Sequence, residues 1–327
     1  MSPKEKLMMQ VMAVFREKGQ KALELAKRTV LQEEVEFQPL RDALRYFMTE
    51  WQDFLHPALL SLACEAVGGR SDEATGVGAA IVLLAAGADV HDDIIDESTV
   101  KGDYPTVYGK FGKDIAILAG DILLFKGMQL LHESCEKLPQ NKKQMILEII
   151  KQAFLEISSA EAEEASHRGN LELTGQEYLK IIKKKVAAGE ASMRIGAILG
   201  SGTTEQTELL GEYGRTFGLL MTIRDEFVDM FEMDELKNRV DKECLPLPIL
   251  FAFTDSSRKT AILRSLKEEI TEETVERILD LTLTSKEIRD LKNMLKQMAR
   301  TEVQRISTFR KHKELFILSL KATLEDL

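Results

Sequence analysis

Two short acidic clusters, one in each half of the chain, are the residues best suited to chemistry. Each reads acid-acid-apolar-apolar-acid, and their members are Asp92, Asp93 and Asp96 in the first cluster and Asp225, Glu226 and Asp229 in the second. Residues three and four apart share one face of a helix, so each cluster gathers like charges that repel one another. Mg²⁺ takes oxygen ligands and is usually held by one or two carboxylates together with substrate phosphates. The sequence therefore predicts a cage in which two acidic clusters and several Mg²⁺ ions hold a diphosphate. A solvated helix face is the alternative for one cluster, and the recurrence of the same form beside apolar stretches argues against it for two.

The composition favours a helical, non-basic protein. The chain has 327 residues, 44% hydrophobic and only 6% aromatic, with a formal net charge of −10. Leu, Ala, Glu, Lys and Met are strong helix formers, and the negative charge argues against a nucleic-acid binder. The three cysteines, Cys64, Cys135 and Cys244, show neither disulfide nor zinc spacing. We therefore expect a cytoplasmic protein, with no signal peptide and no membrane span.

Helical patterns cover most of the chain, and we expect one all-α domain over residues 1–327, a helical bundle around a deep central cavity. The predicted helices span 4–33, 38–67, 71–96, 106–138 with a break in the region 109–113, 141–167 and 174–200, followed by one that opens at 203 and carries the second acidic cluster. Ser71 or Asp72 is expected to cap the third helix, and Thr174 and Thr203 open capping boxes. The first acidic cluster then lies near a helix C-terminus, where acids oppose the macrodipole and a cation is favoured.

Small residues are dense just before the first acidic cluster, from Gly76 to Ala88. They either allow two helices to pack closely or leave space for a cavity, and the sequence does not separate these two interpretations.

Several stretches resemble the trans-isoprenyl diphosphate synthase (polyprenyl synthetase) family. HDDIIDES, from His91 to Ser98, is similar to its first aspartate-rich motif, and IRDEFVD, from Ile223 to Asp229, is similar to the second. Between them, Lys185 and Ala187 match the family's Lys-Thr-Ala site, with Val186 in place of threonine. The segments 105–124 and 245–250 also resemble the family, so the likeness covers roughly residues 40–325.

The resemblance implies a Mg²⁺-dependent prenyltransferase that ionises an allylic prenyl diphosphate, usually as a homodimer. Asp92, Asp96 and Asp225 would ligate two or three Mg²⁺ ions, with Asp93, Asp229 and the neighbouring Glu226 completing the metal site. Asp92, Asp225 and Lys185 would be the catalytic residues. Side chains expected to bind diphosphate oxygens are Lys101, Lys185, Lys237 and Arg239. Such a site stabilises charge on the leaving group, and an apolar cavity excludes water from the carbocation.

The sequence departs from the family where the second substrate, isopentenyl diphosphate, would bind. The family's Gly-Gly-Lys-Arg-x-Arg-Pro element corresponds to residues 51–57, which places Asp53 at the lysine and Phe54 and His56 at the arginines. A family histidine aligns with Ala85, and an Arg-Arg pair aligns with Lys101-Gly102. Nearly all the positive charge is gone, and Asp53 would repel a diphosphate.

Three interpretations remain open. The protein could be a prenyl-chain transferase with an altered acceptor, or a terpene-synthase-like lyase that uses only the allylic site. It could also be a non-catalytic subunit that regulates a related synthase in a heteromer, although the retained acids argue against a wholly inert subunit.

Overall fold

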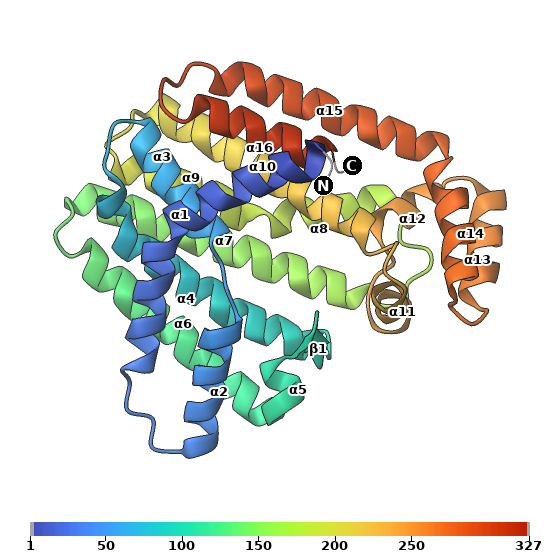
Figure 1. The fold of residues 1–327 in the computed structure, drawn as a ribbon, viewed down its shortest axis with the longest axis horizontal. Coiled ribbons are helices and arrows are strands. Elements are labelled where there is room, and N and C mark those ends of the chain that lie inside the picture. The colour runs from blue at the N-terminus through green and yellow to red at the C-terminus, as the bar shows by residue number, and fades with distance from the viewer. Residues whose placement is uncertain (1–2, 326–327) are drawn as a thin grey trace.

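The computed structural model describes residues 3–325, which form a bundle of helices with one small β-hairpin (Figure 1). The first half comprises α1 (Pro3–Leu31), α2 (Gln38–Glu50), α3 (Leu55–Ala66), α4 (Ser71–Ile95), β1 (Val100–Lys101), β2 (Tyr104–Pro105), α5 (Val107–Phe111), α6 (Lys113–Cys135) and α7 (Gln140–Ser166). The second half comprises α8 (Gly175–Lys185), α9 (Ala187–Leu199), α10 (Thr204–Val228), α11 (Met233–Lys242), α12 (Leu247–Ala252), α13 (Ser256–Leu266), α14 (Glu272–Leu283), α15 (Lys286–Ile306) and α16 (Lys313–Glu325). The all-α prediction is confirmed. The antiparallel hairpin pairs Val100 with Pro105 and occupies the predicted loop after the first acidic cluster.

Two helices predicted as continuous are each broken in two. The first break separates α2 from α3, where Asp53 accepts hydrogen bonds from the backbone N–H groups of Leu55 and His56 and so caps α3. Pro57 then falls in the first turn of α3, where its missing N–H costs nothing. The second break falls at Val186, between α8 and α9. The predicted capping boxes at Thr174 and Thr203 are present, whereas Arg70, rather than Ser71 or Asp72, is the N-cap of α4.

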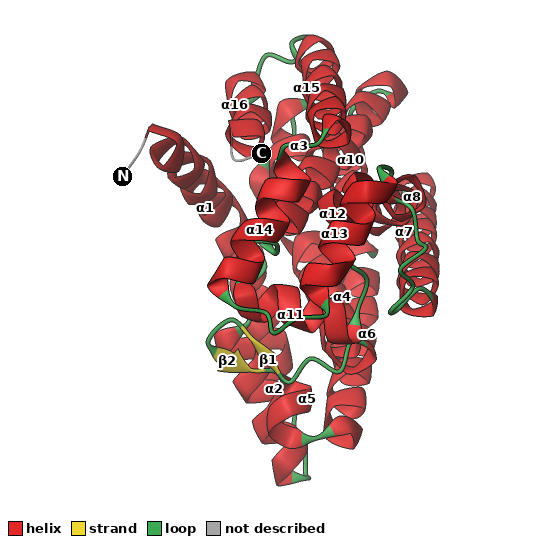
Figure 2. Cartoon of the chain, turned by 90° about the vertical axis from the view of Figure 1, so that its right-hand side faces the viewer, coloured by secondary structure: helices red, strands yellow, loops and turns green. Residues whose placement is uncertain are grey.

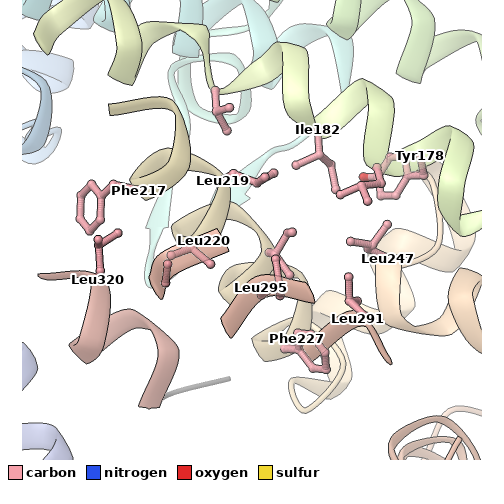
Figure 3. Close-up of a cluster of buried hydrophobic side chains, with 14 of the residues drawn as sticks. Tyr178, Ile182, Phe217, Leu219, Leu220, Phe227, Leu247, Leu291, Leu295 and Leu320 are labelled. Carbon is pink, nitrogen blue, oxygen red and sulfur yellow. The ribbon is translucent and has the colours of Figure 1, made fainter. Parts of the chain in front are cut away.

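Buried side chains form two hydrophobic clusters on either side of α3 and α9. One joins α2, α4 and α6 to the C-terminal half of α1. The other joins α8, α10 and α12 to the C-terminal helices. Figure 3 shows this second cluster, in which Leu219 and Leu220 of α10 lie among Ile182, Leu295 and Leu320. The two clusters fix α4 and α10, the helices that carry the acids.

Glycines bring α4 and α6 into close contact. A Cβ atom on Gly87 would lie 2.7 Å from Leu124 Cγ and 2.9 Å from the carbonyl oxygen of Gly120. A Cβ atom on Gly120 would in turn lie 2.5 Å from the His91 ring. The small residues before the first acidic cluster therefore serve close packing at Gly87.

Helices α4 and α6 are long and apolar enough to cross a membrane by length and composition alone. In α4, 56% of the most apolar window is buried inside the bundle, and in α6, 39%. Core helices of soluble proteins pass the same test, so this is weak evidence for a membrane span.

Candidate active site

The first acidic cluster lies at the C-terminal end of α4, and its three acids have different surroundings. Asp92 is partly buried, and its Oδ1 atom has no hydrogen-bond partner within residues 3–325. Burial, reinforced by the negative charges of Glu161 and Asp96, raises the pKa of Asp92 to about 8. The site thus contains a carboxyl group whose burial and acidic neighbours outweigh the nearby cations Lys185 and Lys101.

Protein cations hold the other two acids of this cluster. Asp93 is almost fully buried, and its Oδ1 lies 3.1 Å from Lys101 Nζ, which also donates to Asp89 at 2.8 Å. Burial raises the pKa of Asp93 to about 6, against the opposing effect of Lys101. Asp96 accepts a 2.6 Å hydrogen bond from Arg168, just after α7.

The second acidic cluster lies at the C-terminal end of α10. Asp225 is exposed, and its Oδ1 lies 3.1 Å from Arg224 Nη1. Asp229 accepts a 2.8 Å hydrogen bond from Arg239 of α11. Burial raises the pKa of Asp229 to about 7 despite this partner.

Glu226 and Arg239, both predicted as site residues, form a buried ion pair with each other. Both Glu226 oxygens accept from Arg239 Nη2 at 3.1 Å, and Oε2 also accepts from the backbone N–H of Leu247 at 2.7 Å. The Arg239 side chain is only 7% exposed, and its remaining N–H groups bind Asp229 and the Cys244 carbonyl. Glu226 therefore anchors the loop before α12, and Arg239 is buried among Glu226, Asp229 and the Cys244 carbonyl. Lys237, the other predicted basic residue of this segment, is exposed.

Lys185, at the end of α8, lies between two glutamates of α7. Its Nζ atom is 3.0 Å from Glu161 Oε2, and it also forms a hydrogen bond with Glu164. These two glutamates and Asp92 outweigh desolvation and raise the pKa of Lys185. Its neighbour Lys184 pairs instead with Glu163. Of the two lysines, only Lys185 belongs to the charged groups around Asp92.

A chain of hydrogen bonds connects Lys185 to the second acidic cluster. Glu164, the partner of Lys185, accepts a 2.5 Å hydrogen bond from the Tyr178 hydroxyl. Tyr178 accepts at 2.9 Å from Arg239, which donates to Asp229. Lys242 of α11 also donates to the Glu97 carbonyl after α4, at 3.4 Å. Figure 2 shows the corresponding arrangement, with α11 beside the β1–β2 hairpin that follows α4. The two acidic clusters therefore belong to one end of the bundle.

Four functional candidates were missed in the sequence: Glu161, Glu164, Arg168 and Tyr178. Glu161 and Glu164 have the three-residue spacing of one helix face, which was the available signal. They lie in an acidic stretch that reads as a solvated helix face. Arg168 and Tyr178 carried no signal, since their partners are distant in sequence.

An apolar cavity of about 620 Å³ extends from this charged region into the bundle. Asp92 and Glu161 contribute to its wall, and α4 lines it with Ile81, Leu84 and Ala88 at helical spacing. Its other walls come mainly from α7 and α9. Gly87 is not among the lining residues, because it faces α6. The cavity has the apolar character required for a hydrocarbon chain, with carboxylates at hand for the polar end.

Residues that replace the family's basic element form a hydrogen-bonded pair. Asp53 Oδ2 lies 2.7 Å from His56 Nδ1, and His56 lines the same cavity as Asp92. No lysine or arginine is among the residues that line this cavity.

The donor set fits a hard divalent cation. Its oxygens are all carboxylate, the kind of ligand that Mg²⁺ takes, and the buried Asp92 Oδ1 has no hydrogen-bond partner in the described part of the chain. Within residues 3–325, no three His, Cys, Asp or Glu side chains already converge in a metal-binding group. Three of these acids instead form ion pairs, with Lys101, Arg168 and Arg239.

Comparison with known proteins decides the family. The polyprenyl synthetase family model matches residues 37–282. The chain belongs to the polyprenyl synthetase family. It is 28% identical over 275 residues to a short chain isoprenyl diphosphate synthase of Methanothermobacter thermautotrophicus, which covers 84% of this chain and 80% of that protein. A geranylgeranyl diphosphate synthase of Sulfolobus acidocaldarius is 28% identical over 70% of this chain and 67% of its own length.

Solved structures agree on the fold of this polyprenyl synthetase. A geranylgeranyl pyrophosphate synthetase from Pyrococcus horikoshii superposes with a TM-score of 0.86 at 24% identity, covering 97% of this chain and 99% of that one. A decaprenyl diphosphate synthase from Rhodobacter capsulatus gives a TM-score of 0.80 at 19% identity, with 99% of both chains covered. The family and the isoprenoid synthase fold predicted from the sequence are both confirmed, and the family's relatives are prenyltransferases.

Proposed function

We propose that this polyprenyl synthetase is a Mg²⁺-dependent enzyme that ionises an allylic prenyl diphosphate and transfers its chain in isoprenoid biosynthesis. The observation that carries the proposal is one apolar cavity whose wall includes Asp92, a partly buried carboxylate whose Oδ1 atom has no hydrogen-bond partner within residues 3–325. The diphosphate would bind at the acidic end of the bundle, with the prenyl chain in the cavity.

The residues divide the work as follows. Asp92, Asp96 and Asp225 would hold the metal ions, with Asp93 and Asp229 supporting them. Bound Mg²⁺ would supply Lewis-acid stabilisation of the charge on the leaving diphosphate. Lys185, positioned by Glu161 and Glu164, would add a fixed positive charge. The apolar side chains of α4, α7 and α9 would exclude water from the carbocation.

The proposal includes an oligomer that forms through α6. Leu118, Phe125 and Met128 are exposed on this helix at spacings of seven and three residues, and 73% of the Phe125 side chain faces solvent. Exposed apolar patches of this kind mark protein interfaces. We propose a homodimer, with a heteromer of related synthases as the alternative. A cytoplasmic location completes the proposal, and it is supported by three buried cysteines without disulfides.

A terpene-synthase-like lyase is the second candidate. It is favoured by Asp53 and His56, which stand where the family's cationic second-substrate site would be. Without an acceptor, an allylic cation would cyclise or lose a proton.

The deciding experiment incubates the purified protein and Mg²⁺ with allylic diphosphates of increasing length, with and without isopentenyl diphosphate, and follows diphosphate release and organic products. Longer prenyl diphosphates support chain elongation. Hydrocarbon or alcohol products without added acceptor support the lyase. No diphosphate release from any allylic substrate would contradict both activities and favour a regulatory subunit.

A further inference from the structure

The Asp53–His56 pair is fixed by several hydrogen bonds and is mostly buried. One Asp53 oxygen, Oδ1, accepts from the backbone N–H groups of Leu55 at 2.9 Å and His56 at 3.2 Å. The other, Oδ2, lies 2.7 Å from His56 Nδ1. The carboxylate is thus fixed by the start of α3, and it fixes the imidazole in turn. Only 10% of the Asp53 side chain and 25% of the His56 side chain are exposed.

This geometry determines which imidazole nitrogen is available for chemistry. With Nδ1 turned to the carboxylate, the proton on that nitrogen is retained and Nε2 becomes the acceptor. Nε2 has no hydrogen-bond partner within residues 3–325, and His56 is among the residues of the cavity wall that also contains Asp92. An oriented imidazole with an open nitrogen next to a reaction cavity is the arrangement of a general base.

Electrostatics constrain the acceptor that would use this base. An Asp–His pair carries at most zero net charge, and with a neutral imidazole it carries −1. It therefore offers no net attraction to a diphosphate. The other titratable groups in the cavity wall are Asp92, His91 and Glu161, and none of them supplies the fixed positive charge of a lysine or arginine. An uncharged nucleophile, such as an alcohol, fits this environment better than a second diphosphate does.

We infer that His56, oriented by Asp53, is the base that removes the proton from an uncharged hydroxyl acceptor as the prenyl chain is transferred to it. This inference rests on the proposed function. In the step, the C1–O bond of the allylic diphosphate breaks and its electron pair leaves with the diphosphate. A lone pair of the acceptor hydroxyl forms the new C1–O bond, and the hydroxyl proton moves to His56 Nε2. Asp53 is a positioning residue that holds the ring and stabilises the imidazolium.

The pH dependence of transfer gives a readout that a structural role would not produce. Asp53 raises the pKa of His56 by stabilising the imidazolium, against the opposing effect of burial. A base must be unprotonated, so transfer should increase as the pH rises through this raised pKa. Removing the Asp53 charge should shift this rise in transfer to lower pH.

The test compares wild type, His56→Gln and Asp53→Asn. Asp280→Asn, at an exposed residue of α14, is the control for loss of one carboxylate. The allylic substrate is geranyl diphosphate with Mg²⁺, and the acceptors are isopentenol and, separately, isopentenyl diphosphate. Diphosphate release and prenylated product are measured separately from pH 5 to 9 (a range of about two units either side of neutrality). Thermal unfolding of each variant checks that it folds.

We expect isopentenol to be prenylated, and His56→Gln to lower that transfer about 100-fold or more, with a much smaller effect on diphosphate release. Asp53→Asn should retain part of the transfer and shift the rise of transfer with pH to lower pH, whereas Asp280→Asn should match wild type. Unchanged transfer in folded His56→Gln overturns the inference, as does transfer that falls with rising pH. Diphosphate release by wild type without transfer to isopentenol overturns it as well. If wild type releases no diphosphate at all, the proposed function itself fails, which is a separate and distinguishable result.

Discussion

Arg239 Nη2 donates to both carboxylate oxygens of Glu226, at 3.1 Å each, in the interior beneath the second acidic cluster. One of the six acids expected at the metal site is therefore part of a buried ion pair. On the same turn of α10, Glu226 is therefore buried in a structural ion pair, whereas its neighbour Asp225 is exposed.

Replacing Glu226 with Gln should destabilise the protein. The change leaves Arg239 buried with less negative charge around it, and breaking a buried pair by removing one partner costs roughly 3–5 kcal/mol. Chemical denaturation measures the loss.

Asp225→Asn is the matched variant, because Asp225 is exposed. It should change stability by about 0.5 kcal/mol or less and lower diphosphate release on the order of a thousandfold, a loss of several kcal/mol of transition-state stabilisation. Equal stability of the two variants would contradict the division of roles.

Lys185→Ala should weaken binding of the allylic diphosphate, since a charged hydrogen bond contributes roughly 1.5–3 kcal/mol. Calorimetric titration of a non-hydrolysable allylic analogue at saturating Mg²⁺ gives the affinities. Lys184→Ala serves as the control, because Lys184 pairs with Glu163 outside the cavity wall. Identical affinities for wild type and the Lys185 variant would mean that this lysine only neutralises Glu161 and Glu164.

The size of the chain accepted should depend on Ala88 and not on its neighbour Gly87. Ala88 lines the cavity, so Ala88→Phe should fill space and shorten the longest substrate or product. Gly87→Phe should instead disrupt the α4–α6 contact, where even a Cβ atom would meet Leu124 at 2.7 Å. Product analysis and thermal unfolding distinguish the two effects. A folded Gly87→Phe protein with shortened products would show that the cavity extends further around α4 than its present lining.

A pH-dependent loss of stability should arise from Glu302 of α15. Its side chain is only 3% exposed, Oε1 has no hydrogen-bond partner within residues 3–325, and burial raises its pKa to about 7. The native state therefore retains a proton that the unfolded chain releases near its ordinary pKa of 4.5. Stability through this group falls as the pH rises from about 4.5 to about 7. Glu302→Gln, which keeps the shape without the charge, should raise the unfolding midpoint at pH 8 and leave it nearly unchanged at pH 4.5. A stabilisation equal at both pH values would exclude titration of Glu302 as its cause.

Phe125→Asp should dissociate the proposed oligomer. A charge placed in the centre of a buried apolar interface is strongly unfavourable, whereas on the exposed monomer surface it costs little. Light scattering after size-exclusion chromatography measures the molar mass. Asp121→Asn, on the same helix, is a control that keeps the apolar side chains. A monomeric wild-type protein would remove this part of the proposal.

The sequence predicted the acids and the family, because a repeated acid-acid-apolar-apolar-acid spacing survives without any knowledge of tertiary contacts. It did not predict which acid of an adjacent pair faces inward. Neighbouring helical residues differ by about 100° in direction. The ion pair with Arg239 turns Glu226 into the interior, and the ion pair with Lys101 does the same for Asp93. The sequence did not predict the break between α2 and α3. Asp53 stands where the family has a lysine, and its role as the cap of α3 is visible only in the structure. Glu161 and Glu164 were missed because acids on a long helix are normally solvated.

Three of the acids expected at the metal site have cationic partners in this structure: Lys101 on Asp93, Arg168 on Asp96 and Arg239 on Asp229. A metal ion at these carboxylates would therefore have to compete with an ammonium or guanidinium group already in place. Each side chain that it displaced would become free to donate to a bound diphosphate. Metal and diphosphate would then gain affinity from each other, because the anion would compensate the cations that the metal had released. Such an exchange predicts weak metal binding by the protein alone and cooperative binding of the two together.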